Sequence, residues 1–280
     1  MTADNTHIHF KILDQIARDL SGDVNFPTCL DAAVMIRNTL RDPLADLAKV
    51  VQVVGVEPLI SSKLLRIANS VVYNPSGWPI TDLSTAIGRL GFEVVRTTSL
   101  AVAMDQMLKS RHLAFEHIGH KAWEHSLEVA AIARVLARRL GRVNPDEAML
   151  AGLVHDIGVF YLLYRAAEFP EYRGNETALL ELLRGWHESI GEGLLYLLGL
   201  PEEIANAISE HDHLTDVGAP CSIRDVLYFA NLLAGGDQDW LPSDITPEQM
   251  AAREADRERY AEFVAEAEAD IQELRATLSA

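Results

Sequence analysis

The sequence predicts an all-α protein. Apolar residues recur three and four positions apart in nearly every segment of the 280-residue chain, the spacing that places them along one face of a helix. Strict alternation of apolar and polar residues, which is typical of a half-buried strand, is scarce. Hydrophobic residues make up 49% of the chain and charged residues 23%, so the composition is that of a globular protein with a sizeable core.

Helical periodicity in the first half of the chain is divided by clear breakers. Asp42-Pro43 ends one helix because the residue before a proline disfavours the α region. Asn74-Pro75-Ser76-Gly77 is a loop sequence, and Gly91 suits the position just after a helix. The predicted helices cover residues 8–20, 31–40, 44–54, a segment that begins at Glu57-Pro58, 84–90 and 92–108.

A polar stretch, residues 109–121, separates the two halves of the chain and contains His112, His117 and His120. Beyond it the same apolar spacing predicts helices over 123–140, 145–163, 177–198, 201–210 and 222–234. We therefore expect an N-terminal helix over residues 1–20, a helical subdomain over 21–110 and a second helical subdomain over 111–235.

Residues 244–280 are predicted to form one C-terminal amphipathic helix. Thr246-Pro247-Glu248-Gln249 has the pattern of a capping box with proline in the first turn. Ten acidic and four basic residues give the segment a net charge of 4 − 10 = −6. The helix either packs on the body with its charged face in solvent or serves as a partner helix, for example in a homodimer. Its apolar stripe comprises Tyr260, Phe263, Val264, Ala267, Ile271, Leu274 and Leu278.

Charge and cysteine content exclude several classes of protein. The formal net charge of −17 disfavours general binding to nucleic acids or to anionic membranes, because both are negatively charged. Cys29 and Cys221 are far apart and predict neither a disulfide framework nor a cysteine zinc site. The N-terminal residues lack a signal pattern, and His155 and Asp156 interrupt the most apolar stretch, 151–167. We expect a soluble cytoplasmic protein.

Eight of the ten histidines fall between residues 112 and 213. Charge is costly in apolar surroundings without a partner, whereas neutral imidazole and carboxylate groups are ligands of iron, manganese and zinc. The pattern therefore predicts either hydrogen-bonded core histidines or a metal pocket built from successive helices. The histidines within or beside apolar helical segments are His125, His155 (followed directly by Asp156), His187 and His211.

Two stretches are specific enough to indicate a family: Leu64-Leu65-Arg66-Ile67-Ala68-Asn69-Ser70 and Gly152-Leu153-Val154-His155-Asp156-Ile157-Gly158. With them the chain, from about residue 20 to 235, resembles the HDOD domain, a relative of the bacterial HD and HD-GYP phosphohydrolases that looks non-catalytic. The resemblance implies an HD-like helical bundle in the second half. Further matching residues are Phe26-Pro27, Glu57-Pro58-Leu59-Ile60, Tyr73, Ile80, Ala86-Ile87, Leu90-Gly91, Trp123-Glu124-His125-Ser126, His187, Leu200-Pro201 and Ile208 to His211.

The sequence departs from the catalytic relatives at the positions that the resemblance marks as functional. Val159 stands where those relatives have a lysine after the His-Asp-Ile-Gly stretch. His211-Asp212 is followed by His213-Leu214-Thr215 and not by a Gly-Tyr-Pro loop. Asn231 takes the place of their last metal carboxylate, and Lys121 that of an upstream acidic ligand. We therefore expect no two-metal centre, because hydrolysis on such a centre requires charge neutralisation on both the attacking and the leaving oxygen.

The resemblance leaves room for a single divalent transition metal, iron, manganese or zinc. It implies a non-catalytic bacterial signal-transduction or scaffold module that acts through a protein partner in trans or a small nucleotide. The alternative is an HD-type metal-dependent phosphohydrolase of nucleotides or cyclic dinucleotides with altered ligands. A third reading is a dimerisation protein that uses its C-terminal helix. The candidate metal ligands are His125, His155, Asp156, His187, His211 and Asn231.

Two other features have competing interpretations. One is a basic run that either binds a phosphate or forms a solvated helix face, and we favour the solvated face. It comprises Arg134, Arg138, Arg139 and Arg142. The other is Asn69-Ser70, which either contacts a ligand or caps backbone groups where a helix ends. We favour the capping role.

Overall fold

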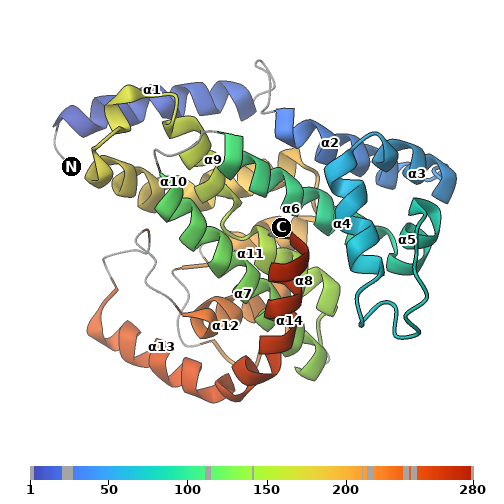
Figure 1. The fold of residues 1–280 in the computed structure, drawn as a ribbon. Coiled ribbons are helices and arrows are strands. Elements are labelled where there is room, and N and C mark those ends of the chain that lie inside the picture. The colour runs from blue at the N-terminus through green and yellow to red at the C-terminus, as the bar shows by residue number, and fades with distance from the viewer. Residues whose placement is uncertain are drawn as a thin grey trace. The chain divides into compact units, whose positions relative to one another are not determined.

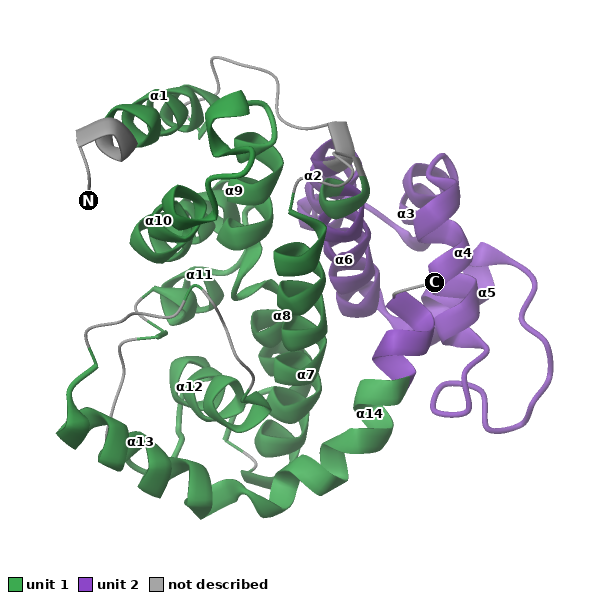
Figure 2. Cartoon of the chain, turned by 60° about the vertical axis from the view of Figure 1, so that its left-hand side comes forward, with its two compact units in different colours: residues 1–25, 107–272 green, residues 26–106, 273–280 purple. Residues whose placement is uncertain are grey.

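The computed structural model describes residues 3–20, 28–110, 115–140, 142–209, 211–212, 217–235, 240 and 245–278. These residues form α-helices, labelled α1 to α14 in Figure 1, with one short 3-10 helix and no strand, which confirms the predicted all-α class. The chain divides into two compact units (Figure 2), and the domain boundaries given above stay predictions. The larger unit contains residues 1–25 and 107–272, and the smaller contains residues 26–106 and 273–280.

The smaller unit is built from helices of the first half of the chain. Side-chain caps begin two of them: Asp46 accepts a hydrogen bond from the Lys49 amide, and Asp82 accepts one from the Thr85 amide. Gly91 ends one helix with a φ of 79°, a conformation that favours glycine, as predicted. The helices are α2 (Thr28–Arg41), α3 (Leu47–Gly55), α4 (Pro58–Ala68), α5 (Leu83–Leu90) and most of α6 (Phe92–Ser110).

Asn69 organises the loop between α4 and α5. Its side-chain amide donates to the carbonyls of Leu65 and Ile80, and its Oδ1 accepts from the Ile80 amide, each at 2.8 Å. These bonds agree with the capping role expected for Asn69. Ser70 Oγ has no hydrogen-bond partner within the described part of the chain, so the same expectation for Ser70 was wrong.

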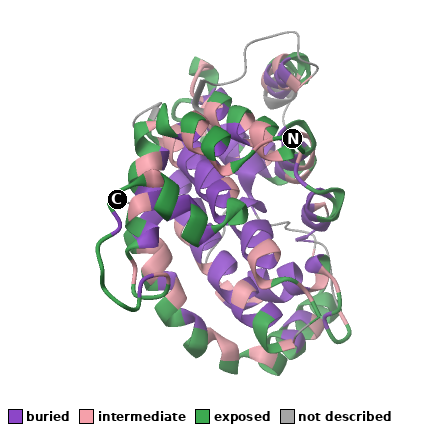
Figure 3. Cartoon of the chain, turned by 90° about the vertical axis from the view of Figure 1, so that its right-hand side faces the viewer, coloured by how far each residue is buried: buried purple, intermediate pink, exposed green. Residues whose placement is uncertain are grey.

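The larger unit is centred on α7 and α8. Gly152 allows the two helices to pack closely, because a Cβ at this position would lie 2.8 Å from the Ala130 Cα. Every residue from Ala148 to Val154 is buried. Figure 3 shows in purple how buried residues gather on the inner helices. The unit contains α1 (Ala3–Leu20), α7 (Glu116–Leu140), α8 (Pro145–Val154), α9 (Ile157–Ala166), a 3-10 helix (Pro170–Tyr172), α10 (Glu176–Leu197), α11 (Glu202–Ile208), α12 (Ile223–Ala234), α13 (Pro247–Tyr260) and most of α14 (Glu262–Leu278).

A turn at His155 and Asp156 divides the stretch that the sequence predicted as one helix over 145–163. Helix α8 ends at Val154 and α9 begins at Ile157, and Asp156 leaves the helical conformation with φ −98° and ψ 19°. By length and composition, residues 145–166 are the one described stretch apolar enough to cross a membrane. However, 89% of its most apolar window is buried inside the fold.

The prediction of one C-terminal helix over 244–280 was wrong. The described residues form two helices, α13 and α14, which meet in a turn at Ala261 and run in different directions in Figure 1. Each helix has its own partners: α13 contacts α12, while Glu266 and Asp270 of α14 pair with Arg139 (2.7 Å) and Arg138 (3.7 Å) of α7. The arginine run is therefore a solvated face only in part, because acidic residues of α14 pair with it.

The N-terminal helix α1 is anchored on the larger unit by a buried polar cluster. Arg165 Nη2 of α9 lies 2.7 Å from Asp19 Oδ2, and the Tyr161 hydroxyl donates to the same oxygen at 3.0 Å. His9 adds a second anchor, because its Nε2 donates to the carbonyl of Ala178 at 3.0 Å. This histidine is thus a hydrogen-bonded core residue.

Candidate metal centre

The structure brings all six predicted ligands together in one buried cluster of the larger unit. His125 comes from the middle of α7, His155 and Asp156 from the turn between α8 and α9, and His187 from α10. His211 follows α11, and Asn231 lies in α12. None of the six is more than 6% exposed. Residues distributed over more than 100 positions therefore share one site, although their roles as ligands stay predictions.

Three of the imidazoles are held in the same way. The Nδ1 atoms of His155, His187 and His211 lie 2.8, 2.8 and 2.7 Å from main-chain carbonyl oxygens three or four residues earlier in the chain. A carbonyl oxygen only accepts hydrogen bonds, so Nδ1 carries the proton in each ring. In the neutral ring, Nε2 is then left with a free lone pair. This tautomer is the one that a histidine ligand needs when it binds metal through Nε2.

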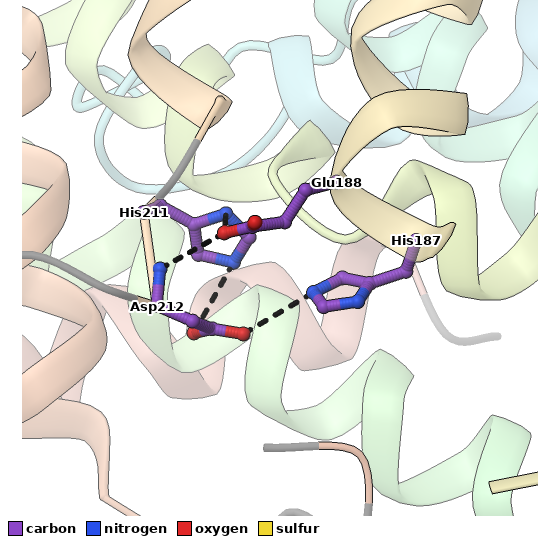
Figure 4. A group of neighbouring side chains, drawn as sticks. All are labelled: His187, Glu188, His211 and Asp212. Atoms are coloured by element: carbon purple, nitrogen blue, oxygen red, sulfur yellow. Dashed lines mark hydrogen bonds and ion pairs between the residues drawn. The ribbon is translucent and has the colours of Figure 1, made fainter. Parts of the chain in front are cut away.

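The Nε2 atoms of these rings converge on Asp156. His155 Nε2 lies 3.3 Å from Asp156 Oδ2, and the Nε2 atoms of His211 and His187 lie 3.6 and 3.9 Å from Asp156 Oδ1. Asp212 forms a second carboxylate contact, 3.2 Å from His187 Nε2 and 3.4 Å from His211 Nε2 (Figure 4). Lone pairs and carboxylate oxygens that face each other repel unless a proton or a cation lies between them.

The electrostatics of the cluster reflect this arrangement. Burial alone would lower the pKa of His211, but Asp212, Asp156 and nearby Glu188 raise it to about 10. Burial would raise the pKa of Asp156, yet the imidazoles of His155, His211 and His187 hold it well below its ordinary value. In the metal-free chain, protons on imidazoles therefore balance the buried carboxylates.

His125 differs from the other three histidines. Burial, together with the neighbouring imidazole of His155, lowers the pKa of His125 to about 4, so its ring is neutral near pH 7. Its Nε2 lies 2.8 Å from Asn231 Oδ1, and Asn231 Nδ2 donates to Asp212 Oδ1 at 3.1 Å. In this structure Asn231 therefore links His125 to Asp212 by hydrogen bonds through both ends of its amide.

A divalent transition metal fits this set of donor atoms. His155 Nε2 and both carboxylate oxygens of Asp156 are buried without a hydrogen-bond partner among the described residues, a state that costs free energy unless a cation satisfies them. Two neighbouring groups each have ligand atoms within 4.8 Å of one another. One is His125, His155 and Asp156, and the other is His187, Glu188, His211 and Asp212.

Glu188 and Asp212 were missed as candidate ligands. Glu188 Oε1 accepts from the Asp212 amide at 3.1 Å and lies 3.4 Å from His211 Nδ1 (Figure 4). Each directly follows a predicted ligand, His187 or His211, and that adjacency was the available signal. They raise the number of carboxylates in the cluster from one to three, so the cluster carries more negative charge than the six predicted ligands supply.

The structure also locates the positions where the sequence departs from the catalytic relatives. Val159 is fully buried near the start of α9 and offers no charge, and Lys121 lies on α7 one turn before His125. His117 and His120 are exposed on α7. Other residues named from the sequence lie outside the described part of the chain: Phe26-Pro27, His112 and His213-Leu214-Thr215.

The fold and the cluster define an all-α protein of HD type with a candidate metal centre. The family description "HDOD domain" matches residues 26–214, and the chain belongs to the HDOD family. A solved structure of a presumed metal-dependent phosphohydrolase from Shewanella amazonensis is similar over 99% of this chain and 100% of its own, with 21% identity and a TM-score of 0.73. An HDOD domain protein of unknown function from Geobacter sulfurreducens is similar over 95% and 96% of the two chains, with 23% identity and a TM-score of 0.61.

Curated relatives match over a shorter region. Ribonuclease Y from Thermotoga petrophila is 34% identical over 93 residues, which cover 33% of this chain and 15% of that protein. Ribonuclease Y from Desulfotalea psychrophila is 33% identical over 109 residues, 39% of this chain and 17% of that protein. The chain thus matches less than a fifth of the length of these relatives. At this identity the solved structures establish the fold alone.

Proposed function

We propose that this HDOD protein is a non-catalytic signal-transduction or scaffold module that holds one divalent transition metal in its buried cluster and acts through a protein partner in trans. The observation that carries the proposal is the burial of all six predicted ligands, none more than 6% exposed. A metal enclosed in this way stabilises the bundle, whereas a phosphodiester substrate needs open coordination positions. A small nucleotide is the alternative signal.

The donor set suggests how the metal is held. His155, His187 and His211 offer Nε2 lone pairs, and Asp156 and Asp212 offer the charge that a divalent ion requires. When bound, the metal would replace the protons that balance the carboxylates in the metal-free chain. Iron, manganese and zinc all accept such a mixture of nitrogen and oxygen ligands.

A metal-dependent phosphohydrolase is the second candidate. It is favoured by the Asp156 oxygens and His155 Nε2, which lack hydrogen-bond partners among the described residues, since a catalytic ion would also use these atoms. Val159 argues against it, because a buried valine cannot hold a substrate phosphate as a lysine does. The C-terminal helices as a homodimer interface remain a further proposal, which the mass of the chain in solution with and without residues 240–280 would test.

The test is metal analysis combined with a hydrolysis assay. The purified chain is stripped with chelator, reloaded separately with Fe(II), Mn(II) and Zn(II), and analysed for bound metal by mass spectrometry. We expect one bound ion per chain, which the His155→Ala variant loses. We also expect no turnover of cyclic dinucleotides or nucleotides above the level of that variant. Turnover by the loaded wild type that disappears in His155→Ala would overturn the non-catalytic proposal in favour of the phosphohydrolase.

A further inference from the structure

Helix α13 buries charged side chains against the larger unit. Its aromatic contact is Tyr260, the last residue of the helix, whose ring centroid lies 4.7 Å from that of Phe229. Its buried residues are Arg253 and Asp256, and both are charged. A surface helix ordinarily buries an apolar stripe, but Met250 of this helix is 58% exposed. Burial of charge is unfavourable unless hydrogen bonds compensate it, so Arg253 and Asp256 depend on the polar contacts that they make.

Most of these contacts reach the main chain between α11 and α12, where two candidate metal ligands lie, and one reaches Tyr228 of α12. Arg253 Nη1 donates to the main-chain carbonyl of Asp212 at 2.7 Å. Asp256 Oδ2 accepts from the Val217 amide at 3.1 Å and from the Tyr228 hydroxyl at 2.9 Å. Arg259, three residues further on, donates to the Val217 carbonyl at 2.9 Å. Side chains three residues apart lie on the same side of a helix, so one side of α13 holds both Asp212 and Val217.

The two described residues that α13 holds here, Asp212 and Val217, lie outside α11 and α12. Helix α11 ends at Ile208, so His211 and Asp212 lie beyond its hydrogen-bonded turns. The Asp212 carboxylate faces His187 and His211 only if its main chain keeps its orientation, and Arg253 bonds to that main chain directly. Groups that orient metal ligands from outside typically change metal affinity 10- to 100-fold when they are removed.

We propose that Arg253 and Asp256 are positioning residues of the metal centre, and that α13 is therefore part of the metal site. This inference rests on the proposed metal binding. It assigns the acidic C-terminal region a role that neither a solvated helix nor a dimer helix would have. Metal retention then depends on whether α13 is docked.

The test compares Arg253→Ala and Arg253→Lys with Arg257→Ala, an exposed arginine on the same helix. Each full-length variant is stripped and titrated with Co(II), whose visible absorption reports ligand geometry. Arg253→Ala is expected to bind Co(II) about 10- to 100-fold more weakly and with an altered spectrum. Arg253→Lys keeps one donor and is expected to recover part of the affinity, and Arg257→Ala is expected to match wild type.

Hydrogen exchange on the metal-free chains gives a second readout. The main chain around Asp212 and Val217 should exchange faster in Arg253→Ala but not in Arg257→Ala. If wild type binds no metal, the proposed function and the positioning role both fail. If wild type binds Co(II) and Arg253→Ala has the same affinity and spectrum, the positioning role alone fails. Should Arg253→Ala not fold, unchanged Co(II) binding by Asp256→Asn and Arg253→Lys would overturn the proposal.

Discussion

Gly158→Ala tests whether the contact between α9 and α10 sets the position of His187. A Cβ at residue 158 would lie 1.9 Å from the His187 carbonyl oxygen and 2.8 Å from the Gly191 amide nitrogen, whereas real Cβ contacts essentially never fall below 3.0 Å. The helices must then separate by about 1 Å, since overpacked cores relieve such clashes through backbone shifts that cost about 1–3 kcal/mol. Metal–ligand distances vary by only about 0.2 Å, so we expect the variant to lose most of its metal affinity.

Gly185→Ala is the matched control on α10. A Cβ there meets no atom within 4 Å, so the substitution should stabilise the helix by about 0.5–1 kcal/mol and leave metal binding unchanged. Urea unfolding of the metal-free chains and Co(II) titration of the folded chains measure the two effects separately. A Gly158→Ala chain with wild-type metal affinity would refute the idea that this contact positions His187.

Three further predictions follow from the larger unit. Arg165→Ala leaves Asp19 buried without its cation and should lower the free energy of unfolding, measured with urea, by about 3–5 kcal/mol. The control Arg18→Ala breaks an exposed ion pair and should lower the free energy of unfolding by at most about 1 kcal/mol. Metal affinity should increase with pH, because nearby carboxylates outweigh burial and raise the pKa of His211 to about 10. Metal binding near pH 7 then releases a proton. Calorimetry in buffers of different ionisation enthalpy detects this proton. Without metal, the stabilisation from that imidazolium is complete below about pH 6.5 and is lost as the pH rises to about 10. Asn231→Asp places two carboxylates side by side and should lower the melting temperature of the metal-free chain but raise it on metal addition; a lower value in both states would contradict this reasoning.

The helices were predictable because most of them bury one face and expose the other. The turn at His155 and Asp156 was not, since α8 and α9 are buried almost all round and their apolar pattern shows no change of phase there. The bend at Ala261 was also hidden, because the apolar stripe continues through it without glycine or proline. Its cause is tertiary: Asp256 bonds Tyr228, whereas Glu266 bonds Arg139.

The candidate site was also predictable only in part. Histidines in apolar segments stand out because their polarity conflicts with their surroundings, and the structure places four of them in one cluster. Glu188 did not stand out, since a glutamate on a helix with an exposed face is ordinarily solvated. Its contact with the Asp212 amide depends on how α10 meets the segment after α11. Arg253, 41 residues beyond Asp212, had no local signal at all.

The charges of the cluster support the proposal of a retained cation over the proposal of substrate turnover. Asp156, Asp212 and Glu188 attract positive charge and raise the pKa of His211 to about 10 despite burial. Asp212 and Asp156 also raise the pKa of His187. A divalent ion would supply the positive charge that the imidazolium of His211 supplies in the metal-free chain. A phosphate would bring further negative charge to the same carboxylates. Because Val159 provides no cation to offset it, the electrostatics that would hold the proposed metal disfavour a phosphodiester.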